Sequence, residues 1–132
     1  MVTLGILLHQ LDDNLARAIT AALSLKAKQH NLRLVYLPSR RLHSPKQFNR
    51  QFNILFDIGV QLPFDGILSI TNSFQAGAYD EEIIQLFSRF QPLPLLSCNF
   101  AAENIPAVII DNKMGAAQLF SHLLDEHKFE RV

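Results

Sequence analysis

Short apolar runs alternate along the chain with longer stretches in which apolar residues recur every three or four positions. A short apolar run is typical of a buried strand, and the wider spacing is typical of a helix that buries one face. Strands that alternate with helices indicate βα units around a parallel sheet. We therefore predict an α/β fold, a Rossmann-like three-layer sandwich with a mostly parallel five-stranded sheet. The predicted strands are Thr3–Leu8, Arg33–Leu37, Gly66–Ile70, Leu93–Cys98 and Ala107–Ile110.

Polar residues that can cap a helix precede each stretch of helical spacing. Ser44 and Gln47 form a capping box, with Pro45 at the first helical position. Glu81 and Glu82 are acidic residues of the kind that stabilise the first turn of a helix. We predict helices that start at Asp12–Asn14, Ser44, Asp80 and Asn112; the first ends near His30 and the second at Gly59 or Pro63.

Each predicted helix has one apolar face, which we expect to pack on the sheet. The expected inward residues are Leu15, Ala18, Ile19, Ala22 and Leu23 in the first helix, Phe48, Phe52, Leu55 and Phe56 in the second, Ile83, Ile84, Phe87 and Phe90 in the third, and Ala116, Ala117, Phe120, Leu123 and Leu124 in the last.

The last two predicted strands are joined only by Asn99–Pro106. A parallel crossover usually needs about a dozen residues or more and contains a helix. The fifth strand is therefore either a short edge element or an irregularly paired one, and both alternatives stay open at this point.

The amino-acid composition indicates one globular domain and argues against nonspecific binding to nucleic acid or membranes. The 132 residues are 48% hydrophobic, which suffices for one domain with a real core. Twelve basic and twelve acidic residues cancel, so the chain lacks the broad positive field that nonspecific binding to nucleic acid or an anionic membrane needs. The adjacent pair Arg40 and Arg41 is interpreted as part of a solvated loop.

Cysteine usage and hydropathy indicate a cytoplasmic protein. Cys98 is the single cysteine, which excludes an intrachain disulfide and suits a reducing compartment. The apolar run Leu4–Leu8 lacks a basic leader and a cleavage site, so it reads as a strand and not as a signal peptide. No window approaches the roughly 18 apolar residues of a membrane span.

Sequence motifs for common chemistries are missing. The first strand-to-helix turn, "LLHQLDDN", has no glycine for close approach to a phosphate. His122 and His127 are five residues apart, off the i, i+4 register that places two imidazoles on one helical face, so we expect no metal site. Cys98 is expected to be a packed small residue, not a reactive thiol. We assign no catalytic residue and no cofactor.

A phosphoacceptor receiver domain is an alternative, because it has a similar length and the same alternation. Asp12 and Asp13 could hold Mg²⁺ after the first strand. The third strand, however, ends in "LSITNS" without the aspartate that would be phosphorylated, and Asp57 falls within a predicted helix. A flavodoxin-like binding or electron-transfer module is a further alternative.

The C-terminal stretch "VIIDNKMGAAQLFSHLLDEHKFERV" resembles a segment of lac-repressor-like, type I periplasmic-binding-protein-like sensor domains. That segment reads roughly V-x-x-D-N-x-x-G-x-x-x-A-x-x-H-L-x-x-x-G-H-x-x-I. The departures are Phe120 near a small-residue position and "EHKFERV" in place of a glycine-histidine pair. "TLGILL", "FDGILSI" and "PLPLLSCN" resemble the first, third and fourth strands of these domains, so the resemblance covers essentially the whole chain. The residues that match the C-terminal pattern are Asp111, Asn112, Gly115, His122, Leu123 and Arg131.

Three further stretches, including "RFQPLPLLS" and "ENIPAVIIDN", look like the variant at the N-terminus of GGDEF diguanylate cyclases, sensor histidine kinases and some transcription regulators. The resemblance implies that residues 1–132 are a single α/β lobe, the first of two that close over a small ligand, with "FERV" leading toward the second lobe and any output domain downstream. It implies a cytoplasmic sensor that is not itself an enzyme, does not contact nucleic acid or membrane, and forms a homodimer through the helix around Leu15, Ala18 and Ala22. A lobe alone should bind its unknown small-molecule ligand weakly or not at all.

In such lobes the strand order is near 2-1-3-4-5, and ligands bind at the carboxyl ends of the strands. Amide and hydroxyl groups in the loops there could hydrogen-bond a polar ligand, and Phe74 could stack on it. Asp111 and Asn112 are expected to organise the strand-to-helix turn instead. The candidate ligand-binding residues are His9, Gln10, Asn14, Thr71, Asn72, Ser73, Phe74 and Asn99.

Overall fold

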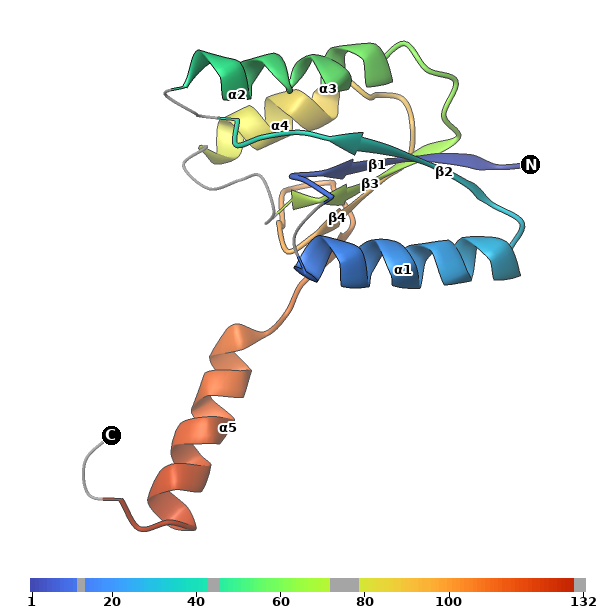
Figure 1. Ribbon diagram of the computed structural model, residues 1–132. Helices are drawn as coiled ribbons and strands as arrows, with labels where there is room; N and C mark the ends of the chain where they lie inside the picture. The colour runs from blue at the N-terminus through green and yellow to red at the C-terminus, as the bar shows by residue number, and fades with distance from the viewer. Residues whose placement is uncertain (12–13, 43–45, 72–78, 130–132) are drawn as a thin grey trace.

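The computed structural model describes residues 1–11, 14–42, 46–71 and 79–129 (Figure 1). Its centre is a five-stranded parallel sheet in the order β2-β1-β3-β4-β5. This order confirms the predicted α/β fold and strand arrangement. The strands are β1 (Thr3–Leu8), β2 (Arg33–Pro38), β3 (Gly66–Ile70), β4 (Leu95–Cys98) and β5 (Ala107–Val108).

Helices cover both faces of the sheet and complete three layers (Figure 1). Helix α1 (Asn14–Gln29) lies on one face, and α2 (Gln47–Gln51), α3 (Ile54–Gly59) and α4 (Asp80–Ser88) lie on the other. The predicted second helix is therefore two short helices. The Ser44 and Pro45 positions of its capping box lie outside the described residues.

The core has two halves because side chains alternate across the sheet. Along β1, Leu7 packs into the cluster under α3 and α4, whereas Ile6 and Leu8 pack toward α1. The larger half is rich in aromatic residues. Its buried members are Leu7, Leu37, Phe56, Phe64, Ile67, Ile83, Leu86, Phe87, Phe90 and Phe100.

The connection between β4 and β5 is a tight loop without a helix. An antiparallel bridge between Ala102 and Ile105 folds the loop on itself. Asn99 and Asn104 have positive φ values of 61° and 62°, a conformation that asparagine tolerates better than most residues. β5 pairs with β4 over only two positions, so the first of the two open alternatives, a short edge strand, is confirmed.

The expected inward faces are confirmed only in part. The residues that pack as predicted are Phe56, Ile83, Phe87 and Phe90, which are buried, and Ile19 and Leu23, which are partly buried. Ile84 is exposed while Leu86 is buried, and Phe48 and Phe52 are exposed although Phe56 is buried. On α1 the buried residues are Ala16 and Ala27, and Leu15 is 58% exposed. Ala18 and Ala22 are exposed as well, so these helices contact the sheet along narrower faces than the sequence spacing predicted.

Helix α5 (Asn112–Asp125) extends away from the sheet (Figure 1). None of its residues, all of which the structure describes, is buried, so the expected packing of Phe120 and Leu124 on the sheet is wrong. Its N-cap is Asp111 and not Asn112, because the Asp111 carboxylate accepts a hydrogen bond from the Met114 amide at 2.8 Å. Asp111 thus organises the strand-to-helix turn as predicted. Within the described ranges, no helix has both the length and the apolar character that a membrane crossing requires.

Candidate functional site

The candidate site lies at the edge of the sheet where the parallel strands end. Because β1 to β4 run in one direction, the loops that follow them meet at this edge. His9 and Gln10 follow β1, Arg40 follows β2, Thr71 follows β3 and Asn99 follows β4. Three of the predicted ligand-binding residues, Asn72, Ser73 and Phe74, lie outside the described residues.

Gln10 and Arg40 meet across the ends of two neighbouring strands. The Arg40 guanidinium donates a hydrogen bond through Nη1 to Gln10 Oε1. The same guanidinium lies over the Phe52 ring, 5.2 Å from its centroid, and the Arg40 amide donates to Asn53 Oδ1 at 3.1 Å. Both arginines lie in a loop, as predicted. Arg41 is exposed, whereas Arg40 is half-buried and its guanidinium is held in place at the strand edge.

Thr71 closes a chain of buried hydroxyl groups beneath the strand edge. Its Oγ1 lies 2.9 Å from Ser69 Oγ and 2.9 Å from Ser97 Oγ, and all three side chains are fully buried. Ser69 and Ser97 are register partners in β3 and β4, so the hydroxyls tie the two strands together. In this structure the Thr71 hydroxyl is occupied by its neighbours, and its ligand contact stays a prediction.

Replacing Thr71 by valine should lower the free energy of unfolding by about 1–2 kcal/mol. Valine keeps the shape of threonine but leaves two buried serine hydroxyls without this partner, and an unsatisfied buried polar group costs about 1–3 kcal/mol. Urea denaturation measures the change. Thr20→Val, at a partly exposed position of α1, is the matched control and should change stability by less than about 0.5 kcal/mol. Equal losses in the two variants would contradict the role of the hydroxyl chain.

The remaining predicted residues have different surroundings. Asn99 Oδ1 accepts a hydrogen bond from the Ile110 amide at 3.2 Å, and the Asn99 amide donates to the Val108 carbonyl at 2.8 Å. Asn99 thus fixes the path of the chain after β4. His9 is half-buried at the strand edge, and Asn14 is exposed in the first turn of α1. Their ligand contacts, like those of Gln10 and Asn99, stay predictions.

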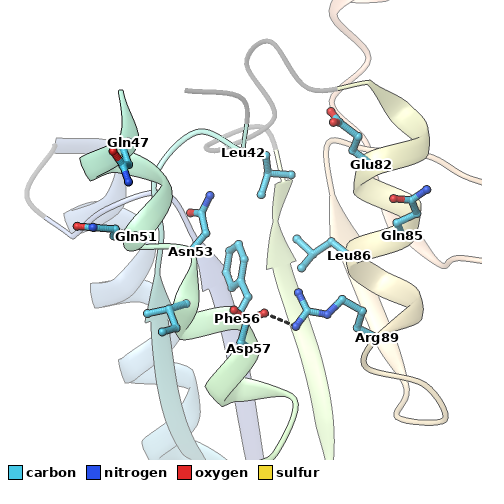
Figure 2. A pocket seen from close by; sticks show the side chains of 11 residues that line it. Leu42, Gln47, Gln51, Asn53, Phe56, Asp57, Glu82, Gln85, Leu86 and Arg89 are labelled. Atoms are coloured by element: carbon cyan, nitrogen blue, oxygen red, sulfur yellow. Dashed lines mark hydrogen bonds and ion pairs between the residues drawn. The ribbon is translucent and has the colours of Figure 1, made fainter. Parts of the chain in front are cut away.

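The helical face opposite α1 has a groove of about 600 Å³ between α2, α3 and α4 (Figure 2). Phe56 lies between the α3 side and the α4 side of the groove (Figure 2). An ion pair between Asp57 of α3 and Arg89, the C-cap residue of α4, bridges the two sides. Asp57 therefore lies within a helix, as predicted, and is paired there. Among the described residues, the groove is lined by Leu42, Gln47, Gln51, Asn53, Ile54, Phe56, Asp57, Glu82, Gln85, Leu86 and Arg89. None of the predicted ligand-binding residues that the structure describes is among them.

Cys98 ends β4 as a half-buried free thiol that packs toward α1. Burial disfavours the charged thiolate and raises the pKa of Cys98 above its ordinary value. This supports the prediction that Cys98 is a packed residue with low reactivity.

The folded chain should consequently react with iodoacetamide at least about tenfold more slowly at pH 8 than the urea-unfolded chain. The thiolate is the reactive form, and a raised pKa leaves less of it at any pH below that pKa. Mass spectrometry of samples quenched over time gives both rates. As the pH rises above the ordinary thiol pKa of about 8.5, the folded rate should keep increasing after the unfolded rate levels off. Equal rates in the two states would contradict the effect of burial.

Comparisons with known proteins agree with this topology. No protein-family model and no curated protein sequence matches the chain. Among solved structures, the transcription regulator CcpA of Lactococcus lactis matches 96% of this chain and 43% of its own, with a TM-score of 0.67 and 19% identity. A LacI family transcriptional regulator from Mycobacterium smegmatis matches 92% of this chain and 40% of its own, with a TM-score of 0.67 and 15% identity. The chain therefore has a LacI-like, periplasmic-binding-protein-like fold and spans about two fifths of the length of these structures.

Proposed function

We propose that this chain is one lobe of a small-molecule sensor domain in a bacterial regulatory protein. The match of nearly the whole chain to LacI-type transcription regulators carries this proposal, and the fold places polar loops together at the strand edge. The chain overlays less than half of each regulator, which supports a second lobe as the partner that completes the cleft. The unpacked helix α5 supports the same arrangement.

The mechanism that we propose is closure of two lobes over a ligand. A ligand can favour the closed state only through its differential affinity for that state. Arg40 is a cation already fixed by Gln10 and Phe52, so little ordering is needed before it binds an acceptor group. We therefore propose a polar ligand with a carboxylate or another electron-rich oxygen, which Arg40 and Gln10 would contact.

The sensor would act in the cytoplasm, without chemistry of its own and without direct contact to nucleic acid or membrane. The output domain is proposed to be a transcription-regulating module, a GGDEF diguanylate cyclase or a histidine kinase, in that order, since both structural neighbours are transcription regulators. Homodimerisation through α1 is also proposed. Leu15, Ala18 and Ala22 are exposed on that helix and available for such contact.

The test of the ligand site uses Arg40→Ala with Arg41→Ala as the matched control. Small carboxylates, sugars and nucleosides are screened by thermal shift against the product of the whole reading frame, and hits are titrated calorimetrically. Loss of the guanidinium should weaken binding at least about tenfold, because a charge-assisted hydrogen bond contributes about 1.5–3 kcal/mol. Arg41→Ala should bind as the wild type does. Equal binding by both variants would refute the Arg40 assignment.

The two-lobe arrangement has an independent test. We expect the reading frame beyond Val132 to encode a second βα lobe and an output domain. Hits from the screen should bind the 132-residue chain much more weakly than the longer product. Tight binding by the isolated chain, or a stop codon directly after Val132, would contradict a shared cleft.

A further inference from the structure

Two histidine side chains meet at the C-terminal end of α5. The Nε2 atoms of His122 and His127 are 3.1 Å apart, and the ring centroids are 4.8 Å apart in an edge-to-face arrangement. The Phe129 ring stacks on His127 with centroids 5.8 Å apart and planes inclined by 20°. His127 is thus held between two aromatic rings.

The end of the helix explains this meeting. The amides of Glu126 and His127 both donate to the His122 carbonyl, so the chain tightens around that residue. Lys128 then takes a positive φ of 57°, and the Phe129 amide donates back to the Leu123 carbonyl at 3.3 Å. His127 lies beyond the last regular turn, which is why the argument that a five-residue spacing keeps the imidazoles apart is wrong.

We propose that His122 and His127 form a binding site for a divalent transition metal that prefers imidazole nitrogen, such as Zn²⁺ or Ni²⁺. Two imidazole nitrogens bound to tetrahedral zinc at about 2.0–2.1 Å lie about 3.3–3.4 Å from each other. The observed separation of 3.1 Å needs an adjustment of only a few tenths of an ångström. Both neutral rings would carry their proton on Nδ1 and present the Nε2 lone pair to the metal.

The chain supplies two ligands to the proposed metal, the Nε2 atoms of His122 and His127. No group of three or more histidine, cysteine, aspartate or glutamate side chains in the part of the chain that is described could hold a metal. The remaining coordination positions are filled by water or by another ligand, which makes the site exchangeable and not structural. The affinity should follow the usual order for imidazole sites, with Ni²⁺ bound more weakly than Cu²⁺ and more tightly than Co²⁺.

The site stays accessible when α5 acquires a partner. At about 100° per residue, His122 lies on the side of the helix opposite Phe120 and Leu124 and shares its side with Gln118 and Glu126. A second lobe that covered Phe120 and Leu124 would leave His122 on the uncovered side of the helix. The metal site therefore does not depend on the proposed sensing function.

The test is calorimetric titration of the full chain with Zn²⁺ and Ni²⁺, using His122→Ala, His127→Ala and the control His30→Ala. His30 is an exposed histidine directly after α1. We expect one metal ion per chain, binding at least about tenfold weaker in either α5 variant, and wild-type binding in His30→Ala. Circular dichroism checks that the variants keep their helices.

A second readout distinguishes ligation from a structural hydrogen bond between the rings. In long-range ¹H–¹⁵N NMR spectra, Zn²⁺ should shift the Nε2 resonances of His122 and His127 and leave those of His30 unchanged. Nε2 shifts in neither ring, or metal binding that survives both α5 substitutions, would overturn the proposal.

Discussion

Replacing Phe56 by alanine should lower the free energy of unfolding by about 3–5 kcal/mol. Phe56 is 1% exposed and belongs to the aromatic half of the core, between α3 and the sheet. Truncating a buried phenylalanine removes its transfer free energy and leaves a cavity that neighbouring side chains fill only in part. The loss is a large fraction of the total stability of a domain of this size. Urea denaturation followed by circular dichroism measures it.

Phe48→Ala is the matched control, because it makes the same chemical change at a position that is 67% exposed. Phe48 makes one edge-to-face contact with Phe52, with centroids 5.2 Å apart. An aromatic pair of this kind contributes about 0.5–1.5 kcal/mol, so the control should lose no more than that. A Phe56→Ala loss as small as the control loss would show that α3 is not firmly packed on the sheet.

The strands were the most predictable part of the fold. The third strand has the predicted bounds, Gly66–Ile70, because glycine and buried apolar residues define both its ends and its interior. The order of the strands came from the resemblance of the C-terminal motif and not from hydropathy. The pattern of apolar residues says that a strand is buried but does not say which strands are its neighbours.

The helix faces were less predictable because the apolar spacing on each helix is compatible with more than one rotation. On α4, both Ile84 and Leu86 are apolar, but only Leu86 is buried in the core cluster. Helix α5 is the extreme case. Its apolar spacing predicted packing on the sheet, but none of its residues is buried, because hydropathy alone does not say what an apolar face packs against.

The candidate site, too, could be predicted only in part, because the sequence does not show which distant residues meet. The loop residues at the strand ends could be named from topology, whereas Arg40 could not, since its partner Gln10 is thirty positions earlier. Only the pairing of β1 with β2 brings the two together. A signal for the buried hydroxyl chain did exist, because Ser69 and Ser97 interrupt two otherwise apolar strands at positions that prove to be in register.

Gly5 lies in the middle of β1, at a crowded point of the sheet. A Cβ atom at this position would lie 2.8 Å from Ile67 Cδ1 and 2.9 Å from two atoms of the Phe64 ring. Both neighbours are buried, so neither can move aside without disturbing the core. Position 5 requires glycine because there is no space for a side chain, not because the backbone has an unusual φ. This explains why glycine, which usually weakens a strand, lies between Leu4 and Ile6.

Gly5→Val should therefore lower the free energy of unfolding by about 3 kcal/mol or more, at the upper end of the usual cost of overpacking. Valine is favoured in strands, so intrinsic propensity works against this loss and a measured decrease must come from the clash.

Gly115→Ala in α5 is the contrasting substitution. A Cβ there meets nothing within 4 Å, and alanine in place of a helical glycine should add about 0.5–1 kcal/mol of helix stability. Helicity measured by circular dichroism should rise in Gly115→Ala, and the urea midpoint should fall in Gly5→Val. If valine at position 5 left the midpoint unchanged, Phe64 would not pack on β1 as described, and the contact that positions the first strand beside β3 would have to be assigned differently.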